Sequence, residues 1–166
     1  MIHLKDYETF WEEIKKRVPE LTGALGVTVD ENMAGTIQKL PLGSMTLFWI
    51  PPNATGIGKH VDDFRDKEMC IIFVMEKYDP SRKGTMDVLS GTQKAMERVK
   101  YLLLDSQRSG CAPIKLADMD LHTMPETKFF AGFAGWSLGF NTLSGLETDP
   151  PRGPRIFSKV FSKQFN

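Results

Sequence analysis

The sequence predicts an α+β fold, with a mixed or mainly antiparallel sheet of about four to six strands and two amphipathic helices packed on one face. Three segments lead to this prediction: an amphipathic stretch near the N-terminus, a nearly continuous apolar run at 69–75, and a strictly alternating segment at 136–141. Apolar spacing of three and four residues is typical of a helix, whereas alternation is typical of a strand. The chain therefore contains both kinds of element.

The first helix is predicted over residues 6–18. Its apolar side chains fall at i, i+3, i+4, i+7 and i+11: Tyr7, Phe10, Trp11, Ile14 and Val18. Asp6 is the expected N-cap, basic residues occupy the last turn, and Pro19 ends the helix. These signals agree on one amphipathic helix.

The next segments are expected to form strands. Two short β-like pieces, 27–29 and 36–40, lie among glycine and acidic residues and fit either a hairpin or an irregular excursion. A strand at 45–50 stops at two prolines, which cannot donate to a ladder. The loop at 53–67 is expected to be exposed. The apolar run 69–75 is then the candidate for a buried central strand, because strands covered on both faces are nearly all apolar.

A second helix is predicted at about 86–105, followed by two more strands. One side of this helix is apolar and comprises Leu89, Thr92, Met96, Val99 and Leu103. A strand is expected at 114–122, closed by Pro125. In the last strand Trp136, Leu138 and Phe140 alternate with Ser137, Gly139 and Asn141. One face of that strand should pack on helices, and the other should be small or polar.

Length and charge predict one soluble domain over 1–146. A chain of 166 residues with 41% hydrophobic residues can bury an ordinary core without disulfides. Lys and Arg number 21, as do Asp and Glu, so no net field favours nucleic acid or an anionic membrane. Cys70 and Cys111 form no C-x-x-C pair, and Cys70 lies in an apolar run, which suits a reducing cytoplasm. The N-terminus does not resemble a signal peptide, and apolar runs are too short for a membrane span.

Residues 147–166 read as a proline-rich connector and an amphipathic arm. Phe157, Val160, Phe161 and Phe165 fall at i, i+3, i+4 and i+8 among basic residues that include Arg155 and Lys159. Either the arm folds back on its own core, as termini often do, or it packs on a neighbouring subunit. A helix this short needs its apolar side covered. These six residues are the candidate interface.

Two groups of His and Asp residues are candidates for a metal site. Asp118, Asp120 and His122 alternate along the predicted strand, so all three would point to one face and could bind a divalent metal. The alternative, which we favour, is a charged, solvated face near a sheet edge. His60 and Asp62 lie in a loop with charges of both signs, where solvation is again the simpler interpretation. We expect no bound metal or other cofactor.

Sequence motifs for catalysis are weak. The segment 56–59 ends in Gly-Lys, but a P-loop would need glycine at Asn53 and Ser or Thr at His60. The serines do not stand in a G-x-S-x-G elbow. Whether the chain is an enzyme stays open, with a non-enzymatic role favoured.

The order of these segments, ending in Gly135-Trp136-Ser137-Leu138-Gly139-Phe140, resembles that of small prophage tail-region proteins of the tail-terminator or tail-completion type. The resemblance implies a structural protein that forms rings or caps with copies of itself and with other tail proteins. It also implies a bacterial cytoplasmic or virion-associated location. Two alternatives are a metal-dependent hydrolase or metal-binding enzyme that uses Asp118, Asp120 and His122, and an adaptor domain unrelated to phage.

Overall fold

The computed structural model describes residues 2–28, 31–59, 64–108, 113–127 and 132–145. These residues form three helices and a six-stranded mixed sheet that is mostly antiparallel. The elements in order are α1 (Leu4–Arg17), β1 (Gly23–Gly26), α2 (Glu31–Gln38), β2 (Met45–Trp49), β3 (Asn53–Ile57), β4 (Arg65–Lys77), α3 (Thr85–Arg108), β5 (His122–Glu126) and β6 (Phe133–Gly145). The predicted α+β class is confirmed.

The sheet is organised around two long strands. Its order is β1-β2-β4-β6-β5, and β3 pairs with the outer end of β4. Strands β4 and β6 are each 13 residues long and pair antiparallel along their whole length, from Arg65 opposite Gly145 to Lys77 opposite Phe133. Among the strands that the structure describes, only β1 and β2 pair in parallel. The apolar run 69–75 therefore lies in the central strand, as the sequence predicts.

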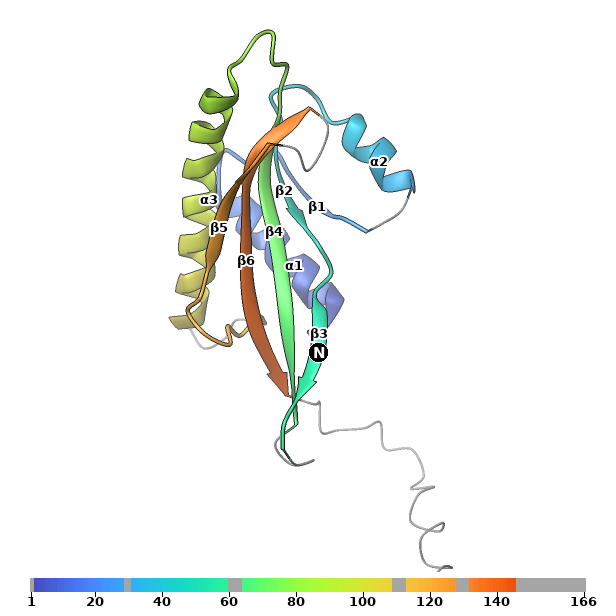
Figure 1. Ribbon diagram of the computed structural model, residues 1–166, viewed down its shortest axis with the longest axis vertical. Helices are drawn as coiled ribbons and strands as arrows, with labels where there is room; N and C mark the ends of the chain where they lie inside the picture. The colour runs from blue at the N-terminus through green and yellow to red at the C-terminus, as the bar shows by residue number, and fades with distance from the viewer. Residues whose placement is uncertain (1, 29–30, 60–63, 109–112, 128–131, 146–166) are drawn as a thin grey trace, which may run out of the picture.

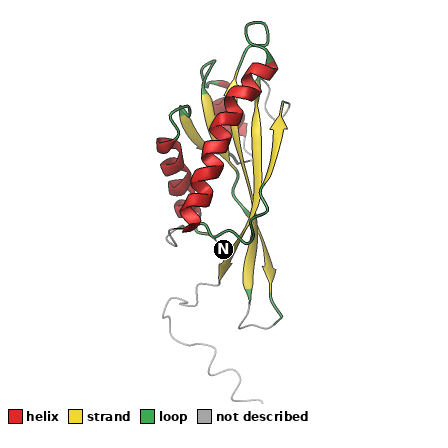
Figure 2. Ribbon diagram, turned by 90° about the vertical axis from the view of Figure 1, so that its left-hand side faces the viewer, coloured by secondary structure: helices red, strands yellow, loops and turns green. Residues whose placement is uncertain are grey.

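Helices α1 and α3 cover the same face of this sheet (Figure 2). Their apolar sides meet alternate residues of β2, β4 and β6 in one core cluster, represented by Trp11, Leu47, Ile72, Val99 and Leu138. The predicted helices are confirmed, although α1 begins earlier than expected. His3 is its N-cap and makes no side-chain cap bond, while Asp6 lies in the first turn.

The opposite face has a much smaller cover. A second cluster joins α2, through Ile37, to Phe48, Phe73, Met75 and Phe133 at one end of the sheet. Figure 1 shows α2 at that end, while the front of β4, β6 and β5 has no helix over it. The eight residues of α2 span only about 12 Å, which is too short to cover 13-residue strands.

Four predictions about secondary structure are wrong. The β-like piece 36–40 belongs largely to α2, and β1 lies at Gly23–Gly26, upstream of 27–29. The predicted loop 53–67 contains β3 and the first three residues of β4, although its described residues are largely exposed, as expected. The predicted strand 114–122 is irregular apart from a single bridge between Leu116 and Thr142, and β5 begins at His122 and includes Pro125. Pro125 is accommodated because β5 is an edge strand.

In the part of the chain that the structure describes, helices are amphipathic, and we find none long and apolar enough to cross a membrane.

Candidate functional site

The candidate metal ligands Asp118, Asp120 and His122 do not form a row on one strand. Asp118 and Asp120 lie in an irregular segment, where the backbone N–H of Asp120 donates to Asp118 Oδ1 at 3.1 Å. His122 begins β5, and its Nε2 lies 3.2 Å from Asp120 Oδ2, with both side chains largely exposed. The prediction that all three share a strand face is therefore wrong, because the alternation of a strand does not extend to 118 and 120.

Other predicted site residues lie outside the described residues. These are His60 and Asp62, together with the arm residues Arg155, Phe157, Lys159, Val160, Phe161 and Phe165. Within the described ranges, no group of three or more His, Cys, Asp or Glu side chains is placed to hold a metal ion.

Two surface hollows are small. One lies beside the start of α3 and is lined by residues that include Glu76 and Lys83, whose side chains pair at 2.6 Å. The other lies between α3 and β5, where Gln93 donates to Glu97 at 3.1 Å. Their volumes, about 220 and 210 Å³, fall below the range of about 300–1,000 Å³ that small-molecule pockets occupy. Their polar groups also bind one another, which leaves the uncovered sheet face as the more informative surface.

An apolar stretch of the uncovered face is open to solvent. We call it the open patch and define it by Met69 and Ile71 on β4, Gly139 and Leu143 on β6, and Met124 on β5. The register places Ile71 opposite Gly139, which in turn faces His122 on β5. Met69 is 50% exposed and Met124 59% exposed, while Ile71 and Leu143 are half-buried. The two methionines lie on either side of β6, four residues apart in register, and the polar residues Asn141 and His122 lie among the apolar ones. Single exposed apolar residues are ordinary, but a group of them that spans three strands is typical of an interaction surface.

Gly139 leaves the middle of this patch without a side chain. A Cβ built on Gly139 would meet no atom within 4 Å, so the space above the strand is open there. At Gly135, four residues earlier on the same strand, the corresponding space is occupied by backbone atoms of β4. A Cβ on Gly135 would lie 2.0 Å from the carbonyl oxygen of Val74, so only glycine allows the close approach of β6 to β4.

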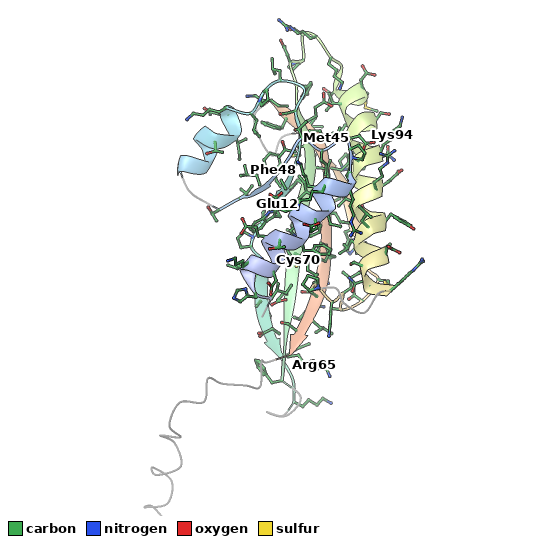
Figure 3. All side chains as sticks on the ribbon, turned by 180° about the vertical axis from the view of Figure 1, so that it is seen from behind. Glu12, Met45, Phe48, Arg65, Cys70 and Lys94 are labelled. Atoms are coloured by element: carbon green, nitrogen blue, oxygen red, sulfur yellow. The ribbon has the colours of Figure 1, made fainter. Side chains whose placement is uncertain are left out.

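One end of the patch is basic. Arg65 pairs with Gly145 and Lys67 with Leu143, and their alternation with Met69 places both on the uncovered side. Both side chains are exposed. Figure 3 shows Arg65 at the end of the strands that projects beyond the helices. The described chain also ends there, at Gly145.

Behind this end, on the helix side, a buried carboxyl group joins three segments. Glu68 is fully buried and accepts hydrogen bonds from Thr142 Oγ1 at 2.8 Å and Ser144 Oγ at 3.2 Å. The backbone N–H of Ile2 also donates to it. Because a buried carboxyl group needs such partners, Glu68 ties the N-terminal residues to β4 and β6.

Next to Glu68 lie a buried thiol and a buried phenol. Burial raises the pKa of the Cys70 thiol to about 11, and Cys70 Sγ lies 3.9 Å from Thr142 Oγ1. Burial, with Cys70 close by, also raises the pKa of the Tyr7 hydroxyl well above its usual value. Figure 3 shows Cys70 on its strand close to α1. A protonated, fully buried thiol is a poor nucleophile, so this group is structural.

Sequence reasoning missed Met69 and Met124 as surface residues. Met69 is the first residue of the apolar run 69–75, which the sequence predicts to be buried, and Met124 follows the predicted strand 114–122. The available signal was the small, polar side of the last strand, Ser137, Gly139 and Asn141, which indicates a face with little packed on it. Its predicted alternation is confirmed, since Leu138 and Phe140 belong to the helix-side core.

Comparison with known proteins finds no family model that matches this chain and no curated protein that resembles it significantly. The site must therefore be interpreted from its own chemistry.

Proposed function

We propose that this protein is a structural subunit of a phage- or prophage-type tail, and that it acts by assembling with copies of itself and with other tail proteins. The observation that carries the proposal is the uneven cover of the sheet. Helices α1 and α3 cover one face of the sheet, while the other face exposes the open patch. An uncovered apolar surface of this kind is more stable when a protein partner covers it.

The sequence beyond the described residues supports the same role. The predicted helical stripe in residues 150–166 consists of Phe157, Val160, Phe161 and Phe165, and a helix this short needs a surface to cover its apolar side. An exposed patch and an apolar arm on one chain supply the two complementary halves of a head-to-tail contact. Such contacts close into rings when the rotation between subunits permits.

The tail assignment rests on the resemblance in element order and on the Gly135–Phe140 segment, which lies in β6 beside the patch. We also propose a virion-associated or bacterial cytoplasmic location, in keeping with that assignment.

Measuring the mass of the assembly that the full chain forms in solution tests the proposal. Light scattering over a hundredfold concentration range should give a mass several times 18.7 kDa, and negative-stain images should show closed rings or caps. Genes for tail-tube or tape-measure proteins are expected beside its gene. A chain that stays monomeric throughout, with gene neighbours unrelated to phage, would contradict the proposal and favour an adaptor role.

A further inference from the structure

We infer that the open patch is the acceptor for the C-terminal arm, residues 157–165, of a second copy of this chain. This inference rests on the proposed self-assembly and makes it more specific, because it names both surfaces of the contact. On the acceptor side are Met69, Ile71 and Met124 around Gly139, and on the donor side are Phe157 and Phe161 with their apolar neighbours.

The patch has room for an apolar helix of the length that the arm could form. Because a Cβ at Gly139 would meet no atom within 4 Å, an aromatic ring has room to approach the strand there. Met69 and Met124 flank that position from the strands on either side, and methionine adapts its shape to aromatic partners. A nine-residue helix from 157 to 165 would be about 14 Å long. The strands β4, β6 and β5, spaced about 4.8 Å apart, span about 10 Å between their outer axes, and Met69 and Met124 are offset by four residues, about 13 Å, along β6.

The length of the connector suits a distant acceptor. The described chain ends at Gly145, and 11 residues, 146–156, separate it from the arm. Fully extended, they reach about 36 Å. Pro150, Pro151 and Pro154 favour extended conformations, so we expect the connector to be a semi-rigid spacer.

The charge of the arm favours an approach from a neighbouring copy. Residues 150–166 hold four basic side chains and no acidic ones: Arg152, Arg155, Lys159 and Lys163. Arg65 and Lys67 lie at the Gly145 end of the patch and repel a basic arm there, whereas Glu126 at the other end has the opposite charge. The chain's own connector, which contains Glu147 and Asp149, would have to be almost fully extended to bring the arm to the Glu126 end, because Gly145 and Gly135, opposite Glu126, are ten residues or about 33 Å apart on β6. An arm from a neighbour can enter from that end.

The first experiment changes the acceptor in the full chain. Met69→Lys/Met124→Lys places positive charge, the sign that the arm itself carries, on the patch at two exposed positions, so the fold should persist. We expect the dissociation constant of the assembly, measured by light scattering, to rise at least about 10-fold. The matched control is Met86→Lys on α3, since Met86 is 76% exposed but lies in the helix layer, and its assembly should be unchanged.

The second experiment tests who supplies the arm. In a Cys111→Ser background, one preparation has Met124→Cys and another has Phe161→Cys; when they are mixed and oxidised, we expect a disulfide between the two chains. Met86→Cys mixed with Phe161→Cys should give none. A chain with both Met124→Cys and Phe161→Cys that closes its disulfide internally, at monomer mass, would overturn the inference, because the arm would then cover its own sheet.

The two proposals fail in different ways. If the full chain assembles but the patch variant assembles equally well and no disulfide forms between chains, the patch is not the acceptor and self-assembly stands. If the full chain is monomeric at all concentrations, both proposals are wrong.

Discussion

The two faces of the sheet are built by the same strands but are completed to different extents. On the helix side, the alternate β4 residues Cys70, Ile72 and Val74 are all fully buried. On the other side Phe73 and Met75 are buried near α2, whereas Met69 is half exposed. Alternation along a strand decides which side chains share a face, but the lengths and connections of the helices decide whether that face is covered. In this protein the 24-residue α3 covers much of one face, and the eight-residue α2 covers a corner of the other.

The largest effect is expected from the helix-side core. Trp11 is fully buried between Tyr7, Phe10 and Phe140, with ring centroids 4.9–6.2 Å away. Trp11→Ala should lower the free energy of unfolding by about 3–5 kcal/mol, because it removes a large side chain and leaves a cavity. Met124→Ala on the other face should change it by less than about 0.5 kcal/mol. Chemical denaturation of dilute protein measures both. Similar losses from the two variants would contradict the comparison of the faces.

Two glycines on one strand test where the uncovered face is tight and where it is open. Gly135→Ala would put a Cβ against the Val74 carbonyl oxygen, and a backbone atom cannot rotate away, so we expect a loss of about 3 kcal/mol. Gly139→Ala meets no neighbour, and it should be neutral or stabilise by up to about 1 kcal/mol through the unfolded chain. Thermal unfolding of the two variants gives the answer. Equal behaviour would mean that the strand spacing at Gly135 is not as described.

Alkaline pH should weaken the helix-side core. The Cys70 thiol, with its pKa raised to about 11, keeps its proton in the folded protein after the unfolded chain has released it. The stabilising contribution is thus complete below about pH 9 and is lost as the pH rises towards 11, by about 2–3 kcal/mol in total. The raised pKa of Tyr7 acts in the same direction.

The measurement is the free energy of unfolding between pH 8 and pH 11. Cys70→Ala should show a shallower decline than the parent protein, while Cys111→Ser serves as the control for losing a thiol. A parent protein whose decline matches that of Cys70→Ala would argue against a pKa shift at Cys70.

The smallest effect concerns the buried carboxyl group at the projecting end of the strands. Thr142→Val keeps the shape of the side chain but removes the 2.8 Å hydrogen bond to Glu68, so we expect a loss of about 1–2 kcal/mol. Asn141→Ala, on the adjacent residue and the opposite face, should cost less than about 0.5 kcal/mol. Urea unfolding distinguishes the two. A neutral Thr142→Val would show that Ile2 and Ser144 satisfy Glu68 without it.

Local patterns in the sequence determined the elements whose side chains meet one large core. The spacing of Tyr7, Trp11 and Ile14 predicted α1, and the alternation of Trp136, Leu138 and Phe140 predicted which side of β6 packs on the helices. These patterns are readable because burial on one side imposes a regular period on the sequence. The central position of the apolar run in β4 followed from the same rule.

Tertiary structure alone decided the rest. Segment 36–40 looks β-like because Thr36 and Ile37 favour strands, yet Ile37 is buried in α2 against Phe48 and Phe73, and that packing overrides local preference. The exposed strands β3 and β5 show no apolar alternation, because hydrogen bonds to β4 and β6 hold them in the sheet and neither buries a face. The open patch joins Met69 to Met124, more than fifty residues apart in sequence, through strand register. Register and helix cover depend on contacts between distant segments, and no local pattern encodes them.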